Sequence, residues 1–279
     1  MRNRNSTKTI SFKPYFGSGF GNHIRGMKGI LLLAILNDPR ICVDYDVYFD
    51  VMRPFLSILK CNSIQGRLID VKTYHSMLVN MNCMPILSEK NVIISSWESA
   101  GSYILKCDSV KSMLEKKGLW RKDIDKKITQ FLFQLVPYLE NYGKSVLNRM
   151  NGLRIGIQLR FGGSFANTKE GATFLNITNF NSTLERIKSI LSKYPDNHSL
   201  FLSSDSNKTI SLLSPLHERI ITADKFALGH TYVKDAFLER TVIDLYILSH
   251  CDVIIATTRS SYGGLAIQLS QTSEYYYIK

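Results

Sequence analysis

From residue 151 onward, short apolar segments of strand-like composition alternate with helical segments, and this alternation restricts the possible folds more than any other feature. Strands are expected at 153–160, 199–204, 220–222, 252–256 and 275–278, and helices at 181–193, at 233–250 and from about 262. Strands separated by helices typically form a parallel sheet with helices on both faces. The sequence therefore predicts a Rossmann-like domain over residues 151–279.

The first half begins with a similar but weaker pattern. An alternating strand at 9–15, an apolar-faced helix at about 22–36 and a strand at 41–44 indicate the start of another α/β domain. Further strand and helix segments are expected at 91–97 and at 119–150, the latter interrupted at Pro137. Because 279 residues suit two domains, we place the boundary at Asn151-Gly152, giving an N-terminal α/β domain over 1–150.

A glycine loop follows the first predicted strand, with the sequence Gly17-Ser-Gly19-Phe-Gly21-Asn22. It is similar to the dinucleotide motif G-x-G-x-x-G, and Asp44 ends the next strand, where a ribose-binding acid would lie. The motif needs a third glycine where this chain has Asn22, which argues against a nicotinamide site. Two interpretations remain: an anion site at a helix N-terminus, or a tight turn without a ligand.

Three predicted strands of the second half end in polar groups. The first strand ends in Arg160, the second in Ser203-Ser204-Asp205, and the strand at 252–256 in Thr257-Thr-Arg-Ser-Ser261. Ligands of open parallel sheets bind beyond these carboxyl ends, and both an arginine fork and a helix N-terminus suit phosphate. Each group also has a structural interpretation: Arg160 could pair with a surface acid, and Asp205, Ser260 and Ser261 could be helix N-caps. Their coincidence on one edge predicts a nucleotide diphosphate site.

Asp244 lies in the otherwise apolar helical stretch from Thr241 to Leu248. One interpretation is an i,i+4 ion pair with Arg240, which on a helix surface is worth only a few tenths of a kcal/mol. The other is a carboxylate that accepts two N–H groups of guanine. The residue pattern leaves both open.

The net charge of +12 lies mostly in the first half, and its densest run extends from Lys111 to Lys127. A solvated helix face explains such a run. General attraction of an anionic sugar nucleotide is a second explanation. Binding of nucleic acid is a third, but no series of stacking aromatic residues or known binding module accompanies the charge, so no nucleic-acid partner is expected.

The polar N-terminus shows neither a signal peptide nor a membrane anchor, and the longest apolar run is far too short to span a membrane. We therefore expect a cytoplasmic protein, or a protein of the Golgi or ER lumen if an N-terminal anchor is missing from this chain. Five Asn-x-Ser/Thr sites would fit the lumen but are also expected by chance.

Five motifs occur in an order that resembles the GDP-fucose-dependent fucosyltransferase superfamily. This superfamily includes plant xyloglucan-type enzymes, bacterial and animal α1,6-fucosyltransferases and protein O-fucosyltransferases. The motifs are Gly17-Ser-Gly-Phe-Gly-Asn22, Ile155-Gly-Ile-Gln-Leu-Arg160, Leu200-Phe-Leu-Ser-Ser-Asp205, Ile243-Asp-Leu-Tyr-Ile-Leu-Ser249 and Thr257-Thr-Arg-Ser-Ser-Tyr262. The resemblance extends from about residue 9 to 271 and rests on the ordered set rather than on any single motif.

The resemblance implies a GT-B fold, in which two Rossmann-like domains with mostly parallel sheets face each other across a cleft. It implies an inverting transfer of fucose from GDP-fucose to a hydroxyl of a glycan or glycoprotein acceptor, without a metal or other cofactor. Gln158 replaces the histidine usual in α1,6- and protein O-fucosyltransferases, and His23 replaces a commoner Arg or Gln. Plant-type members are closer at Gln158. The subfamily and the acceptor therefore stay open.

Individual roles also follow from the resemblance. Arg160 would hold the β-phosphate and stabilise charge on the departing diphosphate, Asp244 would bind guanine, and Asp205 would belong to the donor site. Ser260, Ser261 and Tyr262 would hold the diphosphate. Asn22 and His23 would face the fucose and the acceptor, and the general base is unassigned among His23, Glu98 and Asp205.

The sequence leaves two functions without catalysis open. A non-catalytic nucleotide- or glycan-binding protein of the same fold would bind GDP without turning over GDP-fucose. A basic nucleic-acid-binding protein would bind polyanions with a steep salt dependence and without affinity for GDP.

Overall fold

The structure is a computed structural model with a parallel five-stranded sheet in each of two compact units, 1–134 and 135–279. It describes residues 9–13, 19–37, 40–43, 58–60, 67–69, 91–95, 105–163, 165–166, 172–216, 220–228 and 238–279. The division between the units lies before Leu135, whereas the sequence suggested the Asn151-Gly152 turn. The physical reason is that helix α7 (Pro137–Leu147) packs on helix α10 (Leu238–Ser249) of the second unit.

The sheet of the first unit has the strand order β3-β2-β1-β5-β4, and all of its neighbouring strands are parallel. Its strands are β1 (Thr9–Lys13), β2 (Arg40–Val43), β3 (Ile58–Lys60), β4 (Arg67–Ile69) and β5 (Asn91–Ser95). Helix α1 (Phe20–Asn37) connects β1 to β2, as the sequence predicts, and packs against both.

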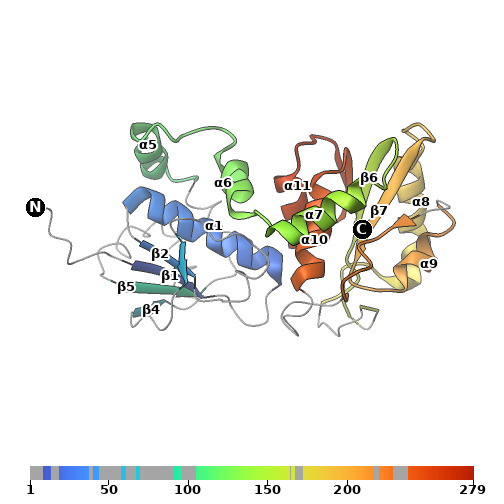
Figure 1. Cartoon of the computed structure of the whole chain (residues 1–279), viewed down its shortest axis with the longest axis horizontal. Coiled ribbons are helices and arrows are strands. Elements are labelled where there is room, and N and C mark those ends of the chain that lie inside the picture. Colours follow the sequence, from blue (N-terminus) through green and yellow to red (C-terminus); the bar gives the residue numbers. More distant parts are fainter. Residues whose placement is uncertain are drawn as a thin grey trace, which may run out of the picture. The chain divides into compact units, whose positions relative to one another are not determined.

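Helices α5 (Asp108–Lys116) and α6 (Ile124–Leu132) pack against α1 in the first unit (Figure 1). The lysine-rich run from 111 to 127 covers most of α5, the turn after it and the start of α6, and Lys111, Lys116 and Lys117 are exposed. Lys28 of α1 is buried and lies 2.8 Å from the Asp125 carboxylate of α6. The solvated-face interpretation thus describes these three lysines, while Lys28 makes a buried connection between helices.

The sheet of the second unit has the order β10-β9-β6-β7-β8, again with only parallel neighbours. Its strands are β6 (Leu153–Leu159), β7 (His198–Ser204), β8 (Ile220–Ile221), β9 (Val253–Thr257) and β10 (Tyr275–Ile278). This is the doubly wound order, in which the chain reverses direction across the sheet between β6 and β9. The predicted parallel α/β fold is confirmed.

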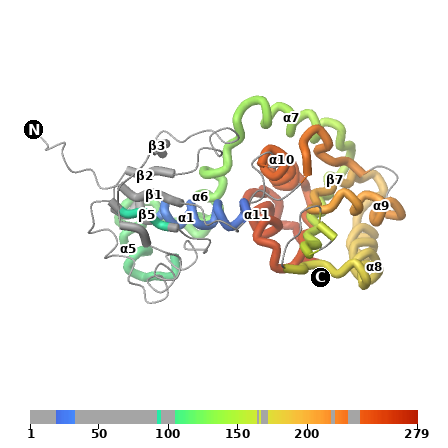
Figure 2. Tube along the Cα trace, turned by 90° about the horizontal axis from the view of Figure 1, so that it is seen from below, coloured from blue at the N-terminus to red at the C-terminus, as the bar shows by residue number. Residues whose placement is uncertain are grey.

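Helices cover both faces of this second sheet (Figure 1). The helices of the unit are α7, η2 (Ile177–Asn179), α8 (Phe180–Leu191), α9 (Thr209–Leu213), α10 and α11 (Ser261–Leu269). Helices α10 and α11 lie side by side in both views (Figure 2). Pro137 occupies the first turn of α7, where its missing N–H has no helical partner to lose.

One hydrophobic cluster of the second unit lies between the sheet and α8. Ile155, Ile157, Leu200 and Ile255 pack there against Ile187, and each of these side chains is fully buried. Apolar residues alternate through β6, form a run of three in β7 and are continuous in β9 up to Thr257, which is why these strands are evident in the sequence. No helix among the described residues is long and apolar enough to cross a membrane.

Candidate functional site

The carboxyl ends of β6 and β9 meet at the switch point of the second sheet and are tied together by side-chain hydrogen bonds. The Arg160 N–H donates to Thr257 Oγ1 at 2.9 Å, and that hydroxyl donates to the Gln158 carbonyl at 3.0 Å. Gln158 Oε1 accepts the Thr257 N–H at 3.2 Å. Ligands of doubly wound sheets bind at this point. The buried polar groups of Gln158 and Thr257 therefore lie where a ligand is expected.

Arg160 is held from two sides. Its Nε lies 3.6 Å from Asp205 Oδ2, and its guanidinium carbon lies 5.4 Å from the centre of the Phe174 ring. An arginine that is oriented by an acid and an aromatic ring loses less freedom when it binds a phosphate. The geometry therefore suits the phosphate role expected for Arg160 and brings Asp205 beside it.

Asp205 also fixes the backbone that follows Arg160. Its two carboxylate oxygens accept the N–H groups of Phe161, at 3.0 Å, and Gly162, at 2.9 Å. Gly162 has φ 66°, and a Cβ there would lie 2.0 Å from the Ala172 carbonyl, so only glycine fits. Asp205 does not cap helix α9, whose N-cap residue is Lys208. Asp205 thus holds the backbone at Phe161 and Gly162 instead of capping a helix.

Helix α11 begins at the same edge of the sheet. Ser260 is its N-cap and accepts the Gly263 N–H at 3.1 Å, as the capping interpretation expects. The cap uses one of the four N–H groups that a helix start leaves without helical partners, so it does not exclude an anion at Ser261. The Tyr262 hydroxyl donates to the Thr241 carbonyl at 2.6 Å. A diphosphate contact by Tyr262 would therefore use its backbone N–H.

Asp244 pairs with Arg240 inside the second unit. Arg240 Nε donates to Asp244 Oδ1 at 2.7 Å, and the Asp244 side chain is only 3% exposed. Burial raises the pKa of Asp244 to about 6, against the opposing effects of Arg240 and of a hydrogen bond with Ser203. The ion pair with Arg240 is therefore present. Because it is buried, it matters more for stability than the exposed i,i+4 pair would. A guanine contact by Asp244 stays a prediction.

The pKa of Asp244 makes the stability of the fold pH-dependent. Between the ordinary value of 3.8 and about 6 the folded state binds more protons than the unfolded state, so the free energy of unfolding falls as pH rises through this window. Titration of Asp244 should change the free energy of unfolding by roughly 3 kcal/mol across this window. Urea unfolding at pH 4, 5, 6 and 7 should reveal it, and Asp244→Asn should lack it. Identical pH profiles for the two proteins would contradict the assignment.

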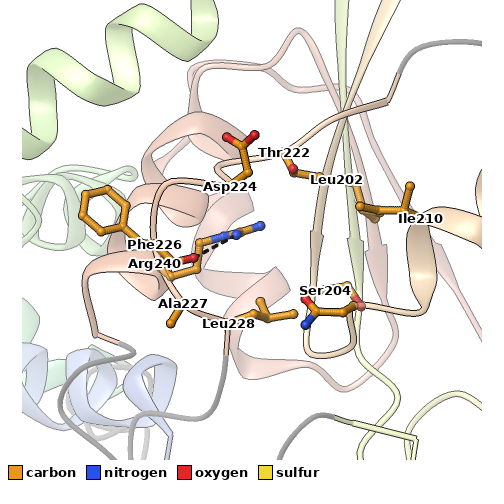
Figure 3. Close-up of a pocket in the computed structure, with 10 residues that line it drawn as sticks. Leu202, Ser204, Ile210, Thr222, Asp224, Phe226, Ala227, Leu228 and Arg240 are labelled. Carbon is orange, nitrogen blue, oxygen red and sulfur yellow. Dashed lines mark hydrogen bonds between the residues drawn. The ribbon is translucent and has the colours of Figure 1, made fainter.

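A cavity of about 280 Å³ opens beyond the carboxyl ends of β7 and β8 (Figure 3). It is lined by Leu202, Ser204, Asn207, Ile210, Thr222, Asp224, Phe226, Ala227, Leu228 and Arg240. Its size is at the lower end for ligand pockets, roughly 300–1,000 Å³, and apolar and polar side chains line it in equal number. A flat ring suits this space better than a complete sugar nucleotide.

The predicted site residues are distributed over both units. Arg160, Asp205, Ser260 and Ser261 come together at one edge of the second sheet. Asn22 and His23 lie in the first turns of α1 in the first unit, where His23 is 5% exposed. Gly17 and Ser18 of the glycine loop, Asp44 and Glu98 lie outside the described residues. The roles of Asn22 and His23 remain predictions.

Sequence reasoning missed the cavity and the place of Arg240 in it. The cavity wall from Thr222 to Leu228 is an irregular segment without a periodic pattern. A usable signal was present at Arg240, because an arginine at the start of an otherwise apolar helix requires a partner or a ligand. Within the part of the chain that the structure describes, no group of three or more His, Cys, Asp or Glu side chains could hold a metal ion.

Solved fucosyltransferase structures share this fold. The α-1,6-fucosyltransferase NodZ, known from Bradyrhizobium and co-crystallised with GDP, has a TM-score of 0.63 at 11% identity over 95% of this chain and 93% of NodZ. FUT1 of Arabidopsis thaliana with GDP has a TM-score of 0.64 at 14% identity, covering 99% of this chain and 71% of FUT1.

POFUT1 in complex with GDP-fucose has a TM-score of 0.57 at 12% identity, over 98% of both chains. No protein-family model and no curated protein sequence matches the chain. The expected likeness to GDP-fucose-dependent fucosyltransferases, and to their GT-B fold, is confirmed at the level of the fold.

Proposed function

We propose that this protein is an inverting fucosyltransferase that transfers fucose from GDP-fucose to a hydroxyl of a glycan or protein. The observation that carries the proposal is Arg160, held by Asp205 and Phe174 at the switch point of a doubly wound sheet. The start of α11 lies at the same edge and supplies backbone N–H groups. Fold neighbours with bound GDP or GDP-fucose add support from analogy.

The diphosphate and the base of the donor would bind at two different parts of this edge. The diphosphate would lie at Arg160 and the N-terminus of α11, where a cation and a helix dipole favour negative charge. The base would enter the cavity beyond β7 and β8. Asp224 lines this cavity, whereas Asp244 is buried behind Arg240. Asp224 is therefore the better placed carboxylate for the N1–H and 2-amino groups of guanine.

In the transfer, an acceptor hydroxyl attacks the anomeric carbon of fucose from the face opposite the diphosphate. The bond from that carbon to the β-phosphate oxygen breaks, GDP departs with the electron pair, and the acceptor oxygen loses its proton. Arg160 would stabilise the negative charge that grows on the β-phosphate, since a prepositioned cation costs no reorganisation at that moment. No general base is assigned.

The direct test is incubation with labelled GDP-fucose on a glycan array, followed by determination of the anomeric configuration of the product. Transfer with inversion is the expected result. GDP binding without transfer to any acceptor and without release of fucose would support the non-catalytic alternative. Salt-dependent polyanion binding without GDP affinity would support a nucleic-acid-binding protein.

Transfer activity is expected to survive EDTA. Arg160 and the start of α11 would supply the positive charge that a divalent cation provides in metal-dependent transferases. The measurement is the initial transfer rate before and after EDTA treatment, with Mn²⁺ added back in a third sample. Loss of activity that Mn²⁺ restores would overturn this role of Arg160.

A further inference from the structure

Arg240 is one of two charged residues, with Asp224, that line the cavity of the second unit. The whole residue is 8% exposed, and in Figure 3 its guanidinium extends from the start of α10 into the space bounded by Leu202, Thr222 and Leu228. Placing such a charge against apolar walls is costly unless it is paired and hydrogen-bonded. The position of Arg240 therefore calls for an account beyond packing.

Two of its three nitrogens have partners that fix the plane of the guanidinium. Nε donates to Asp244 Oδ1 at 2.7 Å, and Nη1 donates to the Phe226 carbonyl at 3.3 Å, the bond drawn in Figure 3. The described residues provide no hydrogen-bond partner for the third nitrogen, Nη2. One N–H of Nη1 and both N–H groups of Nη2 thus remain for a ligand in the cavity.

The walls identify the kind of group that these donors would meet. Leu202, Ile210, Ala227 and Leu228 form apolar surface suited to the face of an aromatic ring. A diphosphate would instead favour the Arg160 edge, where a second cation and a helix N-terminus are available. The ligand atom at Arg240 is accordingly a hydrogen-bond acceptor on the edge of a ring.

We propose that Arg240 is a specificity-determining residue that donates to O6 and N7 of a 6-oxopurine base, with Asp244 as its positioning residue. Arginine donors match this pair of guanine acceptors. Adenine carries an amino group in place of O6, so its donor would face the donors of Arg240. The inference rests on the proposed GDP-fucose site and adds to it the side chain that selects the base.

The test compares GDP with 7-deaza-GDP, in which a C–H group replaces N7 while O6, N1–H and the 2-amino group are retained. Wild-type protein should prefer GDP by about tenfold, because one of the two acceptors for Arg240 is lost. In Arg240→Lys the single ammonium would be engaged by Asp244, so the preference should fall below about threefold. Because the readout is a ratio of affinities, a partly unfolded sample does not alter it.

Arg149→Lys is the matched control. Arg149 Nη2 donates to the Thr222 carbonyl at 3.4 Å, so this arginine contacts the same loop without lining the cavity. Its replacement should leave the preference unchanged. Arg240→Gln is a second variant, for use if the lysine protein does not fold, and should lose the preference similarly.

The outcomes separate the inference from the proposed function. Preserved discrimination in Arg240→Lys, with GDP still preferred over ADP by the wild type, would overturn the role of Arg240 alone. Equal weakening of both nucleotides would overturn it as well, because it would indicate a phosphate contact. A wild-type protein that binds GDP no better than ADP would overturn the guanine specificity of the proposed function, and the inference with it.

Discussion

Replacing Arg160 with alanine is expected to weaken GDP binding by about 2–4 kcal/mol, or roughly thirty- to a thousandfold. The arginine side chain is 18% exposed, and Asp205 and Phe174 orient it before any ligand arrives. Its removal deletes a charge-assisted contact with the phosphate and leaves Asp205 facing that anion without compensation. Isothermal titration of the folded variant with GDP measures the effect.

The matched control is Arg186→Ala, because Arg186 is an exposed arginine on α8. It should leave the affinity for GDP unchanged. Asp205→Asn should weaken binding as well, and the Arg160→Ala, Asp205→Asn double variant should lose less than the sum of the two, since the residues act together. Wild-type GDP affinity in a folded Arg160→Ala protein would remove the basis of the proposed donor site.

The strands of the second unit were predictable because apolar residues alternate through β6, form a run of three in β7 and are continuous in β9 up to Thr257. Arg160 and Ser260 could be located for the same reason, since each follows such a strand. The first half was harder to read, because β3 and β4 have only three residues each and no periodicity emerges over so short a length.

What sequence could not provide were the partners that distant segments supply to buried polar side chains. Spacing indicated the i,i+4 pair of Asp244 with Arg240, but the burial of this pair and the contact of the carboxylate with Ser203 depend on how α10 packs over β7. The position of Asp205 at the end of a strand was evident from the sequence. Its hydrogen bonds with the N–H groups of Phe161 and Gly162, however, join segments more than forty residues apart. Spacing along the chain records neither arrangement.

Asp244→Ala is expected to lower the free energy of unfolding by about 3–5 kcal/mol, because it leaves the buried Arg240 guanidinium without its counter-charge. A solvated i,i+4 pair would cost only a few tenths of a kcal/mol. Equilibrium urea unfolding at pH 7, where the Asp244 carboxylate is ionised in the wild type, distinguishes the two.

Adding Arg240→Met to Asp244→Ala should recover most of the loss in the free energy of unfolding. The unpaired guanidinium charge is then gone, and an apolar side chain fills part of its volume. The double variant should nevertheless lose the preference of the wild type for GDP over 7-deaza-GDP, because residue 240 then offers no donor to N7. A loss below about 1 kcal/mol in Asp244→Ala would mean that water reaches the pair, and Asp244 would no longer serve as the support for Arg240.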